Sequence, residues 1–225
     1  MSANLFEYFH TSRYFSVLLS CCNHFFLDEY ARKNVLKLYE KLSVKFNETL
    51  GYARNDLEGE NCRKEECVLA NLVADSLTNN FDRLLGKNVS KLSKCNNTLA
   101  VVNGGSIHPG INQGNITYKE ILPVLPFGNS MGVLNIKGKQ LTELFQHSAR
   151  QYRRGGLLQT SRIRVSYKLE EKLATLMSLQ TNCQGKWKNV EPNENYLAAD
   201  SDILVLYVQK VHTLEGKIEG RITFE

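Results

Sequence analysis

The side chains that could do chemistry lie in the middle of the chain, between Asn103 and Phe127. Asn103 is followed by Gly104 and Gly105, and two glycines allow backbone amides to come close to a small molecule. The Asn103 amide offers both a donor and an acceptor. Phe127 stands between a proline and a glycine, so its ring can pack inward or face a cleft from a rigid corner. These residues fit a small-molecule site, although most such triplets are ordinary turns and most phenylalanines belong to a core.

A strand and a short helix are expected to position these residues. Residues 99–102 form an apolar run typical of a buried strand, and this strand ends where the Asn-Gly-Gly turn begins. Thr117 and Glu120 have the spacing of a capping box at the start of a short helix, which Pro123 ends. The strand would deliver the turn to the site, and the helix would lead the chain to the rigid corner.

The linked motifs of this stretch resemble those of the C-terminal domain of the 5'-nucleotidase/apyrase family. The family has an apolar strand followed by Asn-Gly-Gly-Gly-Ile-Arg, then Ile-Thr-Tyr or Ile-Thr-Trp, then Val-Leu-Pro-Phe-Gly. The matching segments here are 101–108, 116–118 and 124–128, and the resemblance runs from about Leu27 to the last residue. It implies an α/β fold of mixed α+β layers, with helices covering sheets, preceded by a long hinge-type helix.

The resemblance also implies which residues bind a nucleotide or nucleoside. Arg63 stands in a Cys-Arg-x-x-Glu-Cys segment, where the family's arginine reaches the bound nucleotide. A guanidinium suits phosphate or ribose oxygens because it donates two hydrogen bonds at once. Asn103, Gly104 and Gly105 match the turn after the strand, and Phe127 matches an aromatic that stacks on the base.

Two departures from the family's pattern weaken this site. His108 stands where the family's turn motif ends in arginine, so a permanent charge is replaced by a group that is mostly neutral at pH 7. The family's Asn-x-Phe-Leu-Ala-x-Gly-Gly-Asp-Gly segment has no counterpart between Ser201 and Asp202, which removes a second aromatic and the acidic residue that holds the ribose. We therefore expect weak binding of an adenine nucleotide or nucleoside.

The cysteines indicate an oxidising compartment. The resemblance and a spacing that closes a small loop predict a disulfide between Cys62 and Cys67. Cys183 stands where many family members carry a Cys-x-x-Cys pair, here reduced to one cysteine, so a second disulfide is not expected there. The sequence leaves open the pairing of the remaining cysteines: Cys21, Cys22, Cys95 and Cys183.

An extracellular, secreted glycoprotein is the expected class. Sequons for N-glycosylation occur in polar or turn-like segments, at Asn47, Asn88, Asn96 and Asn115. The apolar run at 15–22 is short and interrupted by polar residues, so a signal peptide is unclear. No stretch reaches the length of a transmembrane helix, and no C-terminal hydrophobic tail that would signal a lipid anchor is expected.

Composition favours one folded domain. The chain has 225 residues, of which 42% are hydrophobic, enough for one sizeable core. Its 28 lysines and arginines against 23 acidic residues give a net charge of +5, without the basic helix or aromatic–basic alternation of a nucleic-acid-binding surface. The local cluster of Arg150, Arg153 and Arg154 is interpreted as the C-terminus of a helix, where positive charge complements the dipole.

The chain divides into three parts. Residues 1–26 are an unassigned leader, residues 27–51 form an amphipathic hinge-type helix that Gly51 is placed to stop, and residues 52–225 form the domain. Within the domain the pattern predicts a helix after Cys67, a helix over 141–149 and a helix that ends at Val211. It predicts strands over 132–136, 163–169, 174–181 and 219–224.

Catalysis by this chain alone is not expected. In the family, a phosphoesterase domain that uses divalent metals such as zinc precedes the domain matched here. Two-metal hydrolysis needs carboxylates and imidazoles around both ions, and the five histidines here occur without Asp-x-His or Gly-Asn-His-[Asp/Glu] patterns. We expect no catalytic residue, metal ligand or cofactor in this sequence, and we assign no chemistry to His147.

Three interpretations of function stay open. The chain is a truncated 5'-nucleotidase/apyrase-family protein that keeps a substrate-binding domain, a secreted interaction protein that uses the surface of this domain, or a partial gene model of an intact enzyme of nucleotide catabolism. The sequence does not distinguish these, and it does not indicate which nucleotide is bound or the oligomeric state.

Overall fold

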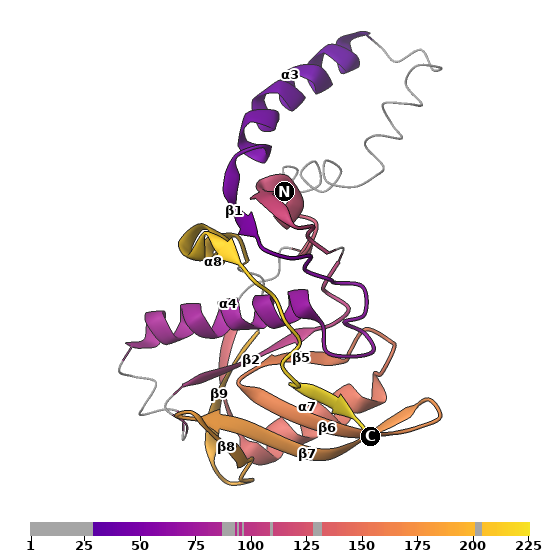
Figure 1. The fold of residues 1–225 in the computed structure, drawn as a ribbon, viewed down its shortest axis with the longest axis vertical. Coiled ribbons are helices and arrows are strands. Elements are labelled where there is room, and N and C mark those ends of the chain that lie inside the picture. Colours follow the sequence, from indigo (N-terminus) through magenta and orange to yellow (C-terminus); the bar gives the residue numbers. More distant parts are fainter. Residues whose placement is uncertain are drawn as a thin grey trace.

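The computed structural model describes residues 29–86, 93, 95, 97–108, 110–127, 132–200 and 204–225. In this part of the chain, helices pack against three mixed sheets (Figure 1). The expected α/β fold of mixed layers is therefore confirmed. The leader at 1–26 lies outside the described residues, and the division of the chain at 27–51 and 52–225 stays a prediction.

The first described element is a helix that extends away from the sheets (Figure 1). This helix, α3, spans Glu29–Phe46, and strand β1 follows at Thr49–Ala53. Gly51 therefore lies in a strand, and its predicted role as the helix stop was wrong. Its lack of a side chain has another cause: a Cβ atom there would lie 2.9 Å from Cγ1 of Val208, so glycine lets β1 pack closely against the helix that contains Val208.

Strand β1 is the middle strand of a small sheet. It has the order β10-β1-β3, with β10 at Thr213–Leu214 and β3 at Gly114–Thr117. The helix beside it, α8, spans Leu204–Val211 and ends at the predicted residue. The short helix α6, Tyr118–Ile121, follows β3 directly, and its capping box between Thr117 and Glu120 is confirmed.

The central sheet has the order β4-β9-β2-β5. Its strands are β4 at Gly132–Lys137, β9 at Asn195–Asp200, β2 at Thr98–Asn103 and β5 at Leu158–Ser161. Every residue of β2 before Asn103 is buried, as the apolar run predicted.

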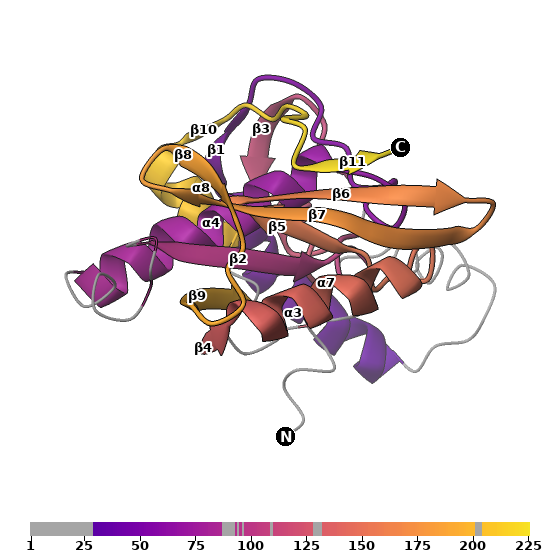
Figure 2. The same ribbon diagram turned by 90° about the horizontal axis from the view of Figure 1, so that it is seen from below.

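Helices cover both faces of β2 (Figure 2). Helix α4, Val68–Leu85, packs on the face of Ala100 and Val102, and helix α7, Gly138–Arg150, shares a core with Leu99 and Val101. The alternation of side chains along a strand explains why one apolar run serves two cores. Because β2 is held on both sides, the position of the turn that follows it is fixed.

The third sheet has the order β11-β6-β7-β8. Its strands are β11 at Ile222–Phe224, β6 at Ile163–Glu170, β7 at Leu173–Cys183 and β8 at Lys186–Asn189. Along β6 the buried side chains of Ile163, Val165 and Tyr167 alternate with more exposed ones, which confirms the predicted half-buried strand.

Two disulfides join cysteines of the described ranges. The bond between Cys62 and Cys67 is confirmed. A second disulfide, which the single cysteine at position 183 had made doubtful, joins Cys183 to Cys95, 88 residues earlier in the chain. The partner of Cys183 is therefore a distant cysteine and not the neighbouring one of a Cys-x-x-Cys pair. Cys21 and Cys22 lie outside the described residues.

Candidate functional site

The Asn103-Gly104-Gly105 turn is tied to a second turn that joins α7 to β5. The Gly104 N–H donates to the Leu157 carbonyl at 2.9 Å, and the Gly105 N–H donates to the Gly155 carbonyl at 2.7 Å. Both amides are therefore used within the protein. The expectation that they would be free to approach a ligand was wrong, because the strand pairing of β2 with β5 continues into the turn.

The two glycines instead permit close packing of three segments. A Cβ atom on Gly104 would overlap the carbonyl oxygen of Cys62 and lie 2.8 Å from that of Leu157. One on Gly105 would lie 2.8 Å from the Gly155 carbonyl oxygen. Both separations are too short for real Cβ contacts, so glycine is needed at each position for the turn, the Cys62 loop and the second turn to meet.

The loop between Cys62 and Cys67 is held in place by Gln159, a buried residue of β5. The Gln159 amide donates to the carbonyls of Cys62 and Glu65, at 2.8 and 2.7 Å, and accepts from the Cys67 N–H at 3.1 Å. The Arg63 carbonyl also accepts from the Arg153 N–H, at 2.8 Å. These bonds fix the backbone that carries the exposed Arg63 side chain beside the turn.

His108 and Phe127 form the other side of the turn. Their ring centroids are 5.4 Å apart, with an interplanar angle of 65° that is typical of an edge-to-face contact. Phe127 is 51% exposed, so its ring faces outward rather than into the core. The His108 N–H donates to the Val124 carbonyl at 3.0 Å, which holds the histidine against the segment that leads to Phe127.

The electrostatic environment keeps His108 uncharged near neutral pH. Burial lowers the pKa of His108 below its usual value of 6.5, and the charge of Arg63 lowers it further. The His108 Nε2 atom is buried and has no hydrogen-bond partner among the described residues. A neutral imidazole beside Arg63 can accept or donate a hydrogen bond, depending on its tautomer.

The structure therefore brings together Arg63, Asn103, His108 and Phe127, which we call the cradle. Arg63 and Asn103 are exposed, and their side chains make no hydrogen bond or ion pair with any described residue. Gly104 and Gly105 support the cradle by packing and do not donate to it. A guanidinium, an amide, an imidazole and an exposed ring can bind a planar heterocycle with polar edges and an attached anion.

Other predicted sites are partly described. Among the predicted glycosylation sites, Asn47 and Asn115 are exposed, whereas Asn88 and Asn96 lie outside the described residues.

Within the described ranges, no group of three or more His, Cys, Asp or Glu side chains could hold a metal ion. No helix in these ranges is long and apolar enough to cross a membrane.

Comparison with known families agrees with these motifs. The family model described as "5'-nucleotidase, C-terminal domain" matches residues 45–205, which is most of the chain. The chain belongs to the 5'-nucleotidase C-terminal domain family.

Individual members of this 5'-nucleotidase family are similar along most of the chain. A snake venom 5'-nucleotidase of Macrovipera lebetinus is 29% identical over 238 aligned positions, covering 88% of this chain and 57% of the relative. A snake venom 5'-nucleotidase of Crotalus adamanteus is 35% identical over 67% of this chain and 26% of its own length. Human 5'-nucleotidase is 28% identical over 84% of this chain and 38% of its own length. The chain thus spans only part of the length of these relatives.

Solved structures show the same fold. The crystal structure of a 5'-nucleotidase precursor from Thermus thermophilus matches with a TM-score of 0.73 and 22% identity, covering 88% of this chain and 43% of that one. The NAD nucleotidase of Haemophilus influenzae matches with a TM-score of 0.63 and 14% identity, over 88% and 41% of the two chains.

The sequence did not reveal the residues that assemble the cradle. Gln159 holds the Arg63 loop, and the turn at Gly155 receives the Gly105 amide. The available signal for Gln159 was an amide side chain directly after the apolar pair Leu157 and Leu158. The contact between the two turns had no local signal, because it joins residues 50 positions apart in the chain.

Proposed function

We propose that the cradle binds an adenine nucleotide or nucleoside, as the substrate-binding part of a 5'-nucleotidase-family protein. The observation that carries this proposal is the convergence of Arg63, Asn103 and Phe127, from three separate segments, as exposed side chains without described polar partners. Phe127 would stack on the base, Asn103 would hydrogen-bond to the edge of the base, and Arg63 would contact ribose or phosphate oxygens.

The expected affinity is weak. Stacking of a base on one aromatic ring contributes about 1–3 kcal/mol. A charge-assisted hydrogen bond from Arg63 contributes about 1.5–3 kcal/mol, from which the cost of immobilising the ligand must be subtracted. The resulting dissociation constant is on the order of millimolar to high micromolar.

The uncharged His108 bears on the choice between nucleotide and nucleoside. Near neutral pH the cradle has one permanent charge, on Arg63, because His108 has a lowered pKa. AMP and adenosine should therefore bind with similar affinity at pH 7.5. At a pH below its folded-state pKa, His108 is protonated, and AMP should then bind more tightly than adenosine because its phosphate gains a second cationic partner.

Titration calorimetry with adenosine and AMP at pH 7.5 and at a series of lower pH values, as far as the chain stays folded, tests this proposal. We expect weak binding of both ligands at pH 7.5 and a preference for AMP at pH values below the folded-state pKa of His108. Phe127→Ala should weaken both ligands at least fivefold, within the range of a lost stacking contact. The exposed residue Leu134 lies on β4, so Leu134→Ala is the control and should change neither affinity.

Two results would contradict the proposal. Binding that is unchanged by Phe127→Ala would place the ligand elsewhere, and AMP binding at low micromolar affinity would mean that the cradle is more complete than its residues indicate. Arg63→Gln and Lys64→Gln provide a matched pair, since both side chains are exposed on the same loop and only Arg63 belongs to the cradle.

We further propose that the 225-residue chain does not release phosphate from AMP or ADP by itself, even with zinc, manganese or magnesium. The residues present do not fit a two-metal site, because the chain lacks the sequence patterns for its ligands and the described residues contain no suitable cluster. Metal-dependent phosphate release that disappears in Arg63→Gln would contradict this proposal.

An extracellular location is part of the same proposal. The disulfides Cys62–Cys67 and Cys95–Cys183 are typical of an oxidising compartment, and the sequons at Asn47 and Asn115 are exposed. Relatives from snake venoms support it. Secretion from cultured animal cells, followed by peptide mapping without reduction and by glycosidase treatment, tests the location, the bonds and the sugars together.

A further inference from the structure

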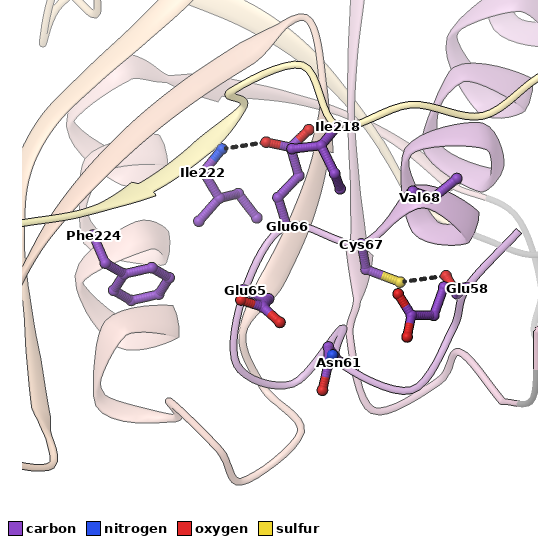
Figure 3. A pocket seen from close by; sticks show the side chains of 9 residues that line it. All are labelled: Glu58, Asn61, Glu65, Glu66, Cys67, Val68, Ile218, Ile222 and Phe224. Carbon is purple, nitrogen blue, oxygen red and sulfur yellow. Dashed lines mark hydrogen bonds between the residues drawn. The ribbon is translucent and has the colours of Figure 1, made fainter.

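A pocket of about 500 Å³ lies between the Cys62–Cys67 loop and the C-terminal segment (Figure 3). Val68, Ile218, Ile222 and Phe224 supply its apolar walls, and Ile218 is 58% exposed. None of the cradle residues lines it. An apolar pocket that opens to solvent can receive the aliphatic part of a side chain.

The strand beside this pocket has a free edge. β11 is the last strand of its sheet and, among the described residues, pairs only with β6. Val165 donates to the Arg221 carbonyl at 2.8 Å and Glu225 donates to the Tyr167 carbonyl at 2.9 Å, so alternate residues of this segment face β6. The N–H and C=O groups of Phe224 consequently face away from β6.

The start of this edge is already occupied. The Ile222 N–H donates to the Glu66 carboxylate at 3.3 Å, and the same carboxylate accepts from the N–H groups of Glu219 and Arg221, both at 2.6 Å. Glu66 therefore covers the edge up to Ile222. The free part begins at the Ile222 carbonyl and continues along Phe224, directly beside the pocket.

The charged side chains that line the pocket are glutamates. Glu58 and Glu65 line it, both are exposed, and neither makes an ion pair with a described residue. Glu66 is not available to a ligand, because its oxygens are used by Asn71 and by the three backbone amides. The free carboxylates therefore favour a cation above the apolar walls.

We propose that this pocket is a docking site for an extended peptide of a partner protein, with a lysine or arginine side chain in the pocket. The peptide backbone pairs with Phe224 at the free edge of β11, the aliphatic stem of the basic side chain packs on Ile218 and Ile222, and its charged end meets Glu58 and Glu65. Strand addition of this kind takes its affinity from backbone hydrogen bonds and its specificity from side-chain pockets. No cradle residue lines the pocket, so this proposal does not rest on the proposed nucleotide site.

The test uses two peptides that differ only in charge. Acetyl-Thr-Val-Lys-Val-Thr-amide carries the basic side chain, and its matched peptide has norleucine in place of lysine. Titration of the full chain at low ionic strength should show binding of the lysine peptide and binding about fivefold weaker, or more, of the norleucine peptide, because each charge pair at a partly exposed site contributes a few-fold in affinity. The Phe224 amide should gain protection from hydrogen exchange when the lysine peptide binds.

Matched variants test whether Glu58 and Glu65 are the carboxylates that bind the basic side chain of the peptide. In the double variant Glu58→Gln, Glu65→Gln, the two peptides should bind with equal affinity. Glu60→Gln removes an exposed charge from the same segment without touching the pocket and should keep the preference for lysine. Equal binding of both peptides to the unmodified chain, absence of binding at millimolar concentration, or an unprotected Phe224 amide would each overturn the proposal.

Discussion

Two groups of polar residues flank the Cys62–Cys67 loop, and they use their side chains in opposite ways. Arg221 is 7% exposed and fully partnered, whereas Arg63 in the cradle is exposed and makes no described ion pair or hydrogen bond through its guanidinium. The same residue type thus serves the fold in one place and is free for a ligand in the other. The difference indicates that the loop is held rigid from one side so that it can present Arg63 on the other.

The partnered group joins the C-terminal segment to α4. Arg221 donates two hydrogen bonds to the Asp75 carboxylate, at 2.8 and 2.7 Å, two to Glu219, at 2.8 and 3.1 Å, and one to the Thr160 carbonyl at 2.7 Å. Burial lowers the pKa of Arg221, but its hydrogen bonds and ion pairs with Asp75 and Glu219 outweigh this effect and leave the pKa raised. Arg221 therefore stays charged, and its charge is fully compensated.

The largest expected effect comes from breaking this compensation. Asp75→Asn removes the charge of the carboxylate that bonds both Nη atoms of the buried Arg221, which then keeps only Glu219 as an anionic partner. The variant should lower the free energy of unfolding by about 3 kcal/mol, the lower end of the cost of breaking a buried ion pair. Arg63→Gln should change it by no more than about 0.5 kcal/mol, as expected for an exposed residue. Urea unfolding of both variants measures the difference. Equal losses of stability would mean that the cradle arginine is part of the fold.

The contact between the two turns should have an intermediate effect. Gly104→Ala pushes a methyl group against the Cys62 and Leu157 carbonyls, so we expect a loss of about 1–3 kcal/mol in the free energy of unfolding. Gly132→Ala is the matched control, because no atom lies within 4 Å of a Cβ at that position. If both variants unfold at the same urea concentration, the turns are not packed as described.

The smallest expected effect concerns His108. Because its pKa is lowered in the folded protein, the unfolded chain binds more protons as the pH falls below about 6.5, and stability decreases from there down to the folded-state pKa. Thermal melts at pH 7.5 and 5.5 measure this decrease in stability. The part of the decrease that comes from His108 should be absent in His108→Gln. His147→Gln changes an exposed histidine on α7 and should keep the loss. A pH dependence that is identical in all three proteins would contradict the assignment.

Local patterns predicted the elements, and distant contacts were not predictable from them. The alternation of β6, the apolar run of β2 and the capping box at Thr117 depend on neighbouring residues, so the sequence was sufficient for each. The bond between Cys95 and Cys183 depends on where β7 ends relative to the start of β2. Strand β9, which pairs with both β2 and β4, was also not predicted.

The candidate site shows the same limit. Arg63, Asn103, His108 and Phe127 were identified by their resemblance to family motifs, and the structure brings them together. The sequence did not show that the N–H groups of Gly104 and Gly105 donate hydrogen bonds to carbonyls of the neighbouring turn. A glycine pair after a strand has two uses, close approach to a ligand and close approach to another segment, and only the spatial arrangement distinguishes them.

The most direct test of the central claim is to map adenosine binding by amide chemical shifts on the isotope-labelled chain. The exposed cradle should respond and the partnered network should not. We expect the largest shifts at Arg63, Asn103, His108 and Phe127, and none at Asp75 or Arg221. Shifts confined to the pocket beside Phe224, or no shifts at millimolar adenosine, would contradict the assignment of the cradle as the nucleotide-binding site.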